Sequence, residues 1–152
     1  MTQRSVAHGT FVIERTYPAT PERVFAAWAS RDAKMQWFGG PEGWESYTMD
    51  FKVGGGEHGR GKPGDGPVYS YDAQYQEIVP NERIVTTYTM DMDQTRISAS
   101  VATVELRPEG AGTRLTVTEM GAFLDGHDKS EFREGGTREL MEALAQALAK
   151  SA

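Results

Sequence analysis

The sequence predicts an α+β protein in which an antiparallel sheet packs against a single long helix. Strand-type alternation dominates from Glu45 to Met120, two short helical segments follow the first strand, and the chain ends in one long amphipathic helix. A sheet that is apolar on one face must bury that face, and one long helix can cover it. With 152 residues we expect one domain, residues 1–152, in which residues 1–9 form a flexible tail.

Two segments around the first helices support this order. Thr10–Tyr17 alternates apolar and polar side chains and predicts a strand. Thr20 before Pro21 is typical of a helix start, with Thr20 as the N-cap. The spacing of the next apolar residues predicts a short helix with one apolar face, formed by Val24, Phe25 and Trp28.

A second short helix is expected directly afterwards. Ser30 or Asp32 can cap it, and it would carry Met35, Trp37 and Phe38 before Gly39-Gly40-Pro41 ends it.

The rest of the chain predicts strands and then the long helix. The expected strands are Glu45–Val53, Val68–Val79, Arg83–Met90, Ile97–Arg107 and Thr113–Met120. The last two flank a glycine-bearing hairpin loop, Pro108–Gly112. The helix is expected over Lys129–Lys150, because apolar or small residues recur there every four positions: Phe132, Gly136, Leu140, Leu144 and Leu148.

Composition excludes several classes of function. The net charge of −6 and the lack of a dense basic run argue against nucleic acid as a partner. The absence of cysteine excludes disulfides, thiolate metal sites and thiol catalysis. The first ten residues lack an apolar signal core, and no stretch approaches the roughly 18 apolar residues of a membrane span. We therefore expect no membrane insertion and a cytoplasmic location.

A glycine cluster at Gly54–Pro63 matches two nucleotide-binding patterns, G-x-G-x-x-G and G-x-x-x-x-G-K. Both need a helix directly after the glycines, because its N-terminus supplies the N–H groups that hold phosphate. Here Lys62 is followed by Pro63-Gly64-Asp65-Gly66-Pro67, which cannot continue as a helix. The cluster is better explained as a bend between strands, with the polar trio Glu57, His58 and Arg60 at a solvated hairpin tip.

An ordered series of motifs gives the chain a family resemblance. The motifs are Tyr17–Trp28 (YPATPERVFAAW), Trp37-Phe38, Asp50–Gly55 (DFKVGG), Ile78–Val85 (IVPNERIV), Gly110–Thr118 (GAGTRLTVT) and Glu134–Leu144 (EGGTRELMEAL). Over about Thr10–Lys150 the chain resembles the activator-of-heat-shock-chaperone-ATPase (AHSA-type) family of the SRPBCC, START-like or Bet v-like helix-grip superfamily.

The resemblance implies a curved antiparallel sheet of about six to seven strands, with the C-terminal helix over its concave face and an apolar cavity between them. Members of the superfamily bind lipids, polyketides, hormones or other hydrophobic molecules, and some are enzymes. The family takes its name from a cochaperone in which such a domain is only the second half, and 152 residues leave no room for the other half.

The chain departs from the family pattern at two places. Glu57, His58, Arg60 and Lys62 stand where an aromatic-rich strand is expected. Gly135-Gly136 replaces a glycine followed by tryptophan at the start of the last helix, which removes a large side chain and would enlarge the cavity.

The residues expected to line the cavity combine large aromatics with residues that share their faces. They are Trp28, Trp37, Phe38, Tyr71, Tyr75, Tyr88, Val117, Glu119, Phe132, Gly136 and Leu140. The tyrosines of the strand that also carries Tyr69 can equally be packed core or outer surface, because periodicity does not show which face is inward. Trp28, Trp37, Phe38 and Phe132 are expected to be mostly core.

Glu119 is a candidate acid–base group, and a tyrosine is the alternative. It continues the inward-facing set of Leu115 and Val117, where a carboxylate would be partly buried with a raised pKa. The alternative is that the strand emerges into solvent at this point. The loop residues Asp125, His127 and Asp128 are adjacent in sequence and lack a fourth ligand, so we predict no metal site and no cofactor.

These features favour a protein that binds a small hydrophobic or amphipathic molecule over an enzyme. Two alternatives stay open: a cochaperone-like interaction module with a chaperone as partner, and a small cyclase or hydrolase that uses Glu119 or a tyrosine. A homodimer is left open as well.

Overall fold

The computed structural model describes residues 3–39 and 43–150 and contains seven strands and three helices in this part of the chain. Their bounds are β1 Val6–Tyr17, α1 Pro21–Ala29, α2 Arg31–Lys34, β2 Ser46–Met49, β3 Gly56–Gly61, β4 Tyr69–Val79, β5 Arg83–Met92, β6 Thr95–Glu109, β7 Gly112–Leu124 and α3 Ser130–Lys150. In that part of the chain, no helix combines the length and apolarity needed to cross a bilayer.

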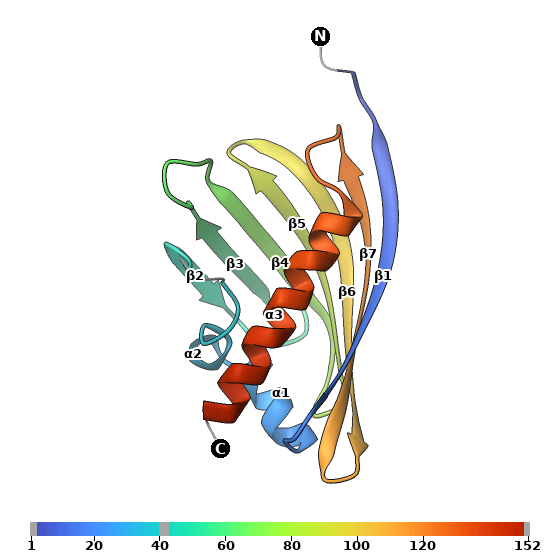
Figure 1. Ribbon diagram of the computed structural model, residues 1–152. Helices are drawn as coiled ribbons and strands as arrows, with labels where there is room; N and C mark the ends of the chain where they lie inside the picture. Colours follow the sequence, from blue (N-terminus) through green and yellow to red (C-terminus); the bar gives the residue numbers. More distant parts are fainter. Residues whose placement is uncertain (1–2, 40–42, 151–152) are drawn as a thin grey trace.

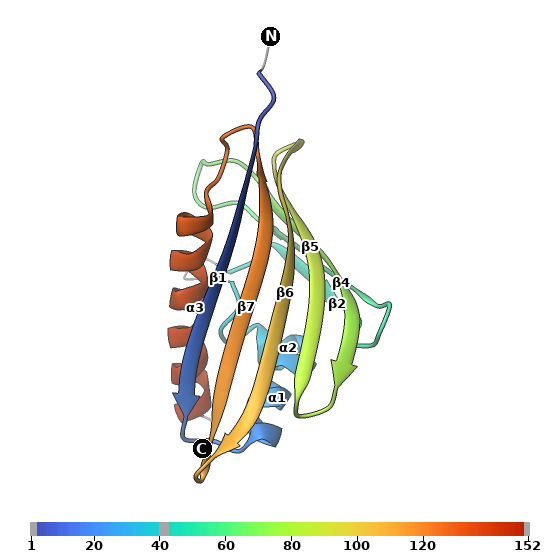
Figure 2. The same cartoon turned by 90° about the vertical axis from the view of Figure 1, so that its right-hand side faces the viewer.

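All seven strands form one antiparallel sheet in the order β1-β7-β6-β5-β4-β3-β2. The sheet curves around α3, which crosses its concave face diagonally (Figure 1). The view turned by 90° shows α3 as a separate layer on one side of the sheet (Figure 2). The predicted helix-grip arrangement is confirmed.

Strand β1 is longer than the sequence predicts. Phe11 and Ile13 are buried while Val12 between them is 52% exposed, as period-two alternation requires. The strand begins at Val6, however, and pairs with β7 from Val6 opposite Leu124 onwards. Residues 6–9 therefore belong to the sheet, and the predicted flexible tail 1–9 is wrong for them. The backbone hydrogen bonds to β7 order a segment whose side chains are exposed.

Helices α1 and α2 begin where capping side chains predict. The Thr20 side chain accepts a hydrogen bond from the Arg23 N–H, with Pro21 as the first helical residue. The Ser30 side chain caps α2 by accepting from the Ala33 N–H. The expected extent of α2 is wrong: it ends at Lys34, and Met35, Trp37 and Phe38 follow in a turn. The predicted stop continues into Gly40-Pro41, which lies outside the described residues.

Most of the glycine cluster, Gly56–Gly61, forms strand β3, whereas the sequence predicts a bend between strands. The strand expected at Glu45–Val53 covers only Ser46–Met49, and the chain turns at Gly54, where φ is +85°, before β3 begins. Gly59 in β3 has a packing role, because a Cβ there would lie 2.8 Å from the Trp44 ring and 2.9 Å from the Tyr47 ring. A strand and not a helix follows the turn at Gly54. The helix N-terminus that a phosphate-binding loop needs is therefore missing, as the sequence predicts.

The core lies under the C-terminal half of α3. Met141, Leu144 and Leu148 are the buried residues of this helix, and they join the inward side chains of β1, β6 and β7 and of α1 in one cluster. The Tyr17 hydroxyl donates a 2.9 Å hydrogen bond to the Met141 carbonyl and ties the helix to β1. The N-terminal half of α3 contributes no fully buried residue.

We predict that Leu144→Ala lowers the free energy of unfolding by about 2–5 kcal/mol, because Leu144 is 0% exposed at the contact between the two layers. Gln146→Ala, on the exposed side of the same helix, should change it by less than about 0.5 kcal/mol. Urea denaturation of the three proteins measures the difference. Equal effects of both substitutions would contradict this account of the core.

Candidate ligand-binding cavity

A cavity of about 410 Å³ lies between the sheet and the N-terminal half of α3. The turn after α2 closes one side, and strands β4 to β7 form the floor. All eleven residues predicted to line a cavity lie in its wall. Their part in ligand binding stays a prediction.

One of these residues is more exposed than expected. Phe132 was predicted to be mostly core, but its side chain lies at the rim of the cavity and the residue is 66% exposed. Gly136 one turn later is also exposed, and a Cβ built on it would meet no atom within 4 Å. Gly136 therefore leaves open space beside α3, and Phe132 lies largely in solvent.

Aromatic rings form a connected wall. The Phe38 ring stacks on Trp44 at 5.9 Å between centroids and meets Tyr71 edge-on at 5.3 Å. Tyr71 in turn lies 4.9 Å from Tyr88. The inward face of β4 is thus the face that carries Tyr71 and Tyr75. Periodicity alone did not show which face of this strand is inward.

The expectation of a solvated hairpin tip is wrong for Glu57. Its side chain is 0% exposed, and one carboxylate oxygen accepts a 2.7 Å hydrogen bond from the Lys34 ammonium, itself buried. The Tyr75 hydroxyl donates to the other oxygen. Glu57 lies inward because alternation along β3 places it on the same face as Gly59.

Lys34 lies in the cavity wall with its ammonium 4.4 Å from the centre of the Phe38 ring. Burial lowers the pKa of Lys34, whereas the carboxylate of Glu57 acts in the opposite direction. Burial also raises the pKa of Tyr75, and the charge of Glu57 adds to that shift. Each of the two buried charged groups therefore has the other as its partner.

The other two polar residues of the glycine cluster face away from the cavity. His58 contacts the Asp72 carboxylate at 2.7 Å, and Arg60 contacts the same oxygen at 3.1 Å. For these two residues the expectation of a solvated position fits, although they lie on the outer face of β3 rather than at a hairpin tip.

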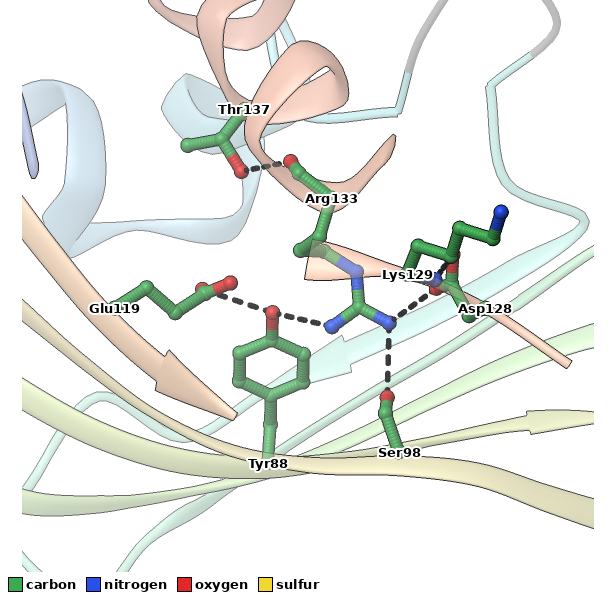
Figure 3. Close-up of polar contacts among 7 residues, drawn as sticks. All are labelled: Tyr88, Ser98, Glu119, Asp128, Lys129, Arg133 and Thr137. Atoms are coloured by element: carbon green, nitrogen blue, oxygen red, sulfur yellow. Dashed lines mark hydrogen bonds and ion pairs between the residues drawn. The ribbon is translucent and has the colours of Figure 1, made fainter. Parts of the chain in front are cut away.

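A second polar group lies at the opposite side of the cavity, between β5, β7 and α3 (Figure 3). The Tyr88 hydroxyl donates to the Glu119 carboxylate at 2.8 Å and accepts from the Arg133 guanidinium at 2.9 Å. Arg133 also donates to Ser98 and to Asp128, each at 2.8 Å. The guanidinium thus joins the start of α3 to the floor of the cavity.

Glu119 is buried, with 5% of the residue exposed, so the strand does not emerge into solvent at this position. Oε1 accepts from Tyr88, whereas Oε2 is buried without a hydrogen-bond partner. Burial raises the pKa of Glu119, against the opposing effects of the Tyr88 hydrogen bond and the Arg133 charge. The carboxylate that the sequence singled out is therefore held inside the cavity wall.

The cavity wall also contains residues that the sequence did not predict, among them Lys34, Trp44 and Arg133. A signal existed for Arg133, because it lies three residues before Gly136 and so shares a helix face with it. No comparable signal pointed to Lys34, whose α2 spans only four residues, or to Trp44, which lies in a loop.

The loop considered for a metal site holds its acids in other contacts. Asp125 bonds to Arg4 and to the Ser5 N–H, and Asp128 bonds to Arg133. Within residues 3–39 and 43–150, no group of three or more His, Cys, Asp or Glu side chains is arranged to hold a metal ion.

The curved sheet, the crossing helix and the cavity between them define a helix-grip protein of the SRPBCC superfamily. Residues 18–149 match the model of the family described as Activator of Hsp90 ATPase homolog 1-like protein, and the chain belongs to this family. No curated protein matches the chain.

Two solved structures of bacterial proteins are similar over almost the whole chain. The Mll3558 protein from Rhizobium loti is 52% identical, with 94% of this chain and 99% of that chain covered and a TM-score of 0.89. A putative uncharacterized protein from Rhizobium leguminosarum is 42% identical, with 98% and 99% covered and a TM-score of 0.94. Family and fold fit a ligand-binding or cochaperone-like role.

We predict that Glu57→Leu lowers the free energy of unfolding by about 3–5 kcal/mol, because it leaves the buried Lys34 ammonium without its carboxylate. The double variant Lys34→Met/Glu57→Leu should recover most of that loss. Glu77→Leu, which breaks the exposed pair with Arg83, serves as the control and should change the free energy by about 1 kcal/mol or less. A double variant as unstable as the single one, in urea denaturation, would argue against this pair as the cause.

The raised pKa of Glu119 predicts that the stability of the folded protein depends on pH. Its pKa is raised in the folded protein, so the folded state binds the proton more tightly than the unfolded state does. The stability that this raised pKa contributes is fully present below the ordinary pKa of glutamate and is lost as pH rises through the pKa of Glu119 in the folded protein. Glu119→Gln should remove this loss, so that the variant gains stability relative to the parent as pH rises. Thermal unfolding of both proteins across that window measures the difference, and parallel curves would contradict the prediction.

Proposed function

We propose that this protein binds a small, mainly apolar molecule in the cavity between its sheet and α3. The observation that carries the proposal is the volume of about 410 Å³ that the side chains leave between these two layers. It falls within the range of about 300–1,000 Å³ that is usual for small-molecule sites.

The lining suits a ligand with an apolar body and few polar groups. Aromatic rings such as Phe38, Trp44 and Tyr71 form much of the wall, and aliphatic side chains of β5 to β7 form part of the floor. Each 100 Å² of apolar ligand surface buried there would contribute about 2.5 kcal/mol of binding free energy. The charged side chains in the wall are mostly paired with one another, so they can orient a ligand without requiring it to carry a charge.

The family description also names activation of a chaperone ATPase, and a cochaperone-like role remains compatible with the fold. Ligand binding is preferred because it uses the cavity, whereas no surface feature described above points to a chaperone. The glycine pair in α3 supports the same preference. Gly135 and Gly136 each cost about 1 kcal/mol relative to alanine in a helix, and no neighbour approaches either one closely.

We predict that Gly136→Trp abolishes binding, because the new side chain lies on the cavity side of α3 and fills the space. Gly135→Trp is the matched control, since Gly135 is exposed in the same turn but does not line the cavity. The measurement is native mass spectrometry of the parent and both variants, each purified from the protein's own host. A small molecule should accompany the parent and Gly135→Trp but not Gly136→Trp. Retention by Gly136→Trp would contradict this location of the site.

A further inference from the structure

We infer that the cavity selects an uncharged molecule with an apolar, flat body and an oxygen that accepts a hydrogen bond from the Glu119 carboxyl group, as in an aryl ketone. This inference rests on the proposed function and adds the chemical class of the ligand. It is carried by the direction of the hydrogen bonds around Glu119 and by the pairing of the other charges.

The direction of the hydrogen bonds is set by Arg133. A guanidinium can only donate, so the Tyr88 oxygen must accept its N–H at 2.9 Å. The Tyr88 hydroxyl then donates its proton to Glu119 Oε1 at 2.8 Å, the contact drawn as a dashed line in Figure 3. Oε1 is thereby occupied as an acceptor.

Oε2 is the remaining polar atom of the carboxyl group. It is buried and has no hydrogen-bond partner, and the cross-strand neighbours of Glu119 are Phe11 and Ala102, which offer none. A proton on the carboxyl group belongs on Oε2, because Oε1 already accepts from Tyr88. The protonated Glu119 is therefore a donor, and a ligand oxygen would satisfy it.

Burial, rather than the surrounding charges, favours the neutral acid at this position. The titratable groups that face Glu119 are Tyr88 from β5, Tyr71 from β4 and Arg133 from α3. Arg133 is already paired with Asp128 and favours the ionised form, but burial outweighs it and raises the pKa of Glu119.

Lys34 and Glu139, two other charged residues of the wall, do not serve as counter-ions for a charged ligand at Glu119. Lys34 is paired with Glu57, and Glu139 is exposed to solvent at the rim. A ligand ammonium or carboxylate at Glu119 would be buried without a dedicated counter-ion, provided that Glu119 is neutral.

The test uses three probes that share a naphthalene ring and a two-carbon substituent: acetylnaphthalene, ethylnaphthalene and naphthylethylamine. They offer an acceptor oxygen, no polar group and a cation, respectively. Quenching of tryptophan fluorescence reports binding, because Trp28, Trp37 and Trp44 line the cavity. At a pH near the ordinary pKa of glutamate, below the raised pKa of Glu119, the ketone should bind roughly three- to tenfold more tightly than the hydrocarbon, the effect of one net hydrogen bond. This advantage should disappear as pH rises through the raised pKa of Glu119.

Two variants separate the donor role from a packing role. Glu119→Gln keeps an oxygen for Tyr88 and places an N–H donor at the other position, so the preference for the ketone should persist and lose its dependence on pH. Glu119→Leu should bind ketone and hydrocarbon equally well.

Each other outcome has a defined meaning. Equal binding of ketone and hydrocarbon by the parent protein would overturn the inference while leaving the proposed function intact. Tightest binding of the amine, increasing with pH, would overturn it in favour of an ionised Glu119. Failure of all three probes to bind would count against the proposed function itself.

Discussion

The cavity depends on how α3 is attached to the sheet. Its C-terminal half is packed tightly, with Leu144 fully buried and the Met141 carbonyl bonded to Tyr17 of β1. Its N-terminal half contributes no fully buried residue and is held to the floor by the Arg133 guanidinium, which donates to Tyr88 and Ser98. A straight helix on a curved surface cannot touch it everywhere. Where side chains are large the layers are in contact, and at Gly136 a space is left.

A space of this kind is stable only if the polar groups around it are satisfied. The Lys34–Glu57 pair joins α2 to β3, and the Tyr88–Glu119 hydrogen bond joins β5 to β7. Such buried charges cost free energy that an apolar core would save, and in return they position donors and acceptors inside an apolar pocket. Two atoms of the wall, Trp28 Nε1 and Glu119 Oε2, are buried without a partner, and Glu119 Oε2 is the one to which a ligand oxygen is assigned.

The fold and most of the cavity wall could be predicted because both follow local rules. Alternation along β4 and β7 places Tyr71 with Tyr75 and Val117 with Glu119, and four-residue spacing places Gly136 with Leu140. The same rules misled at Glu57, where glycines on both sides suggested a bend and the strand was not recognised. The prediction that Phe132 is mostly core was wrong for a different reason. Its helix face was assigned correctly, but the residue lies at the rim of the cavity and is mostly exposed.

The sequence by itself determined the type and order of the elements, the caps that start α1 and α2, and the absence of a helix after the glycine cluster. Propensity, alternation and capping act over a few residues, so a short segment contains the whole signal. The tertiary structure alone decided which polar residues meet. Lys34 and Glu57 are 23 residues apart, and Tyr88 and Glu119 are 31 residues apart. Contacts between side chains so distant in sequence depend on strand order and sheet curvature, which no local pattern specifies.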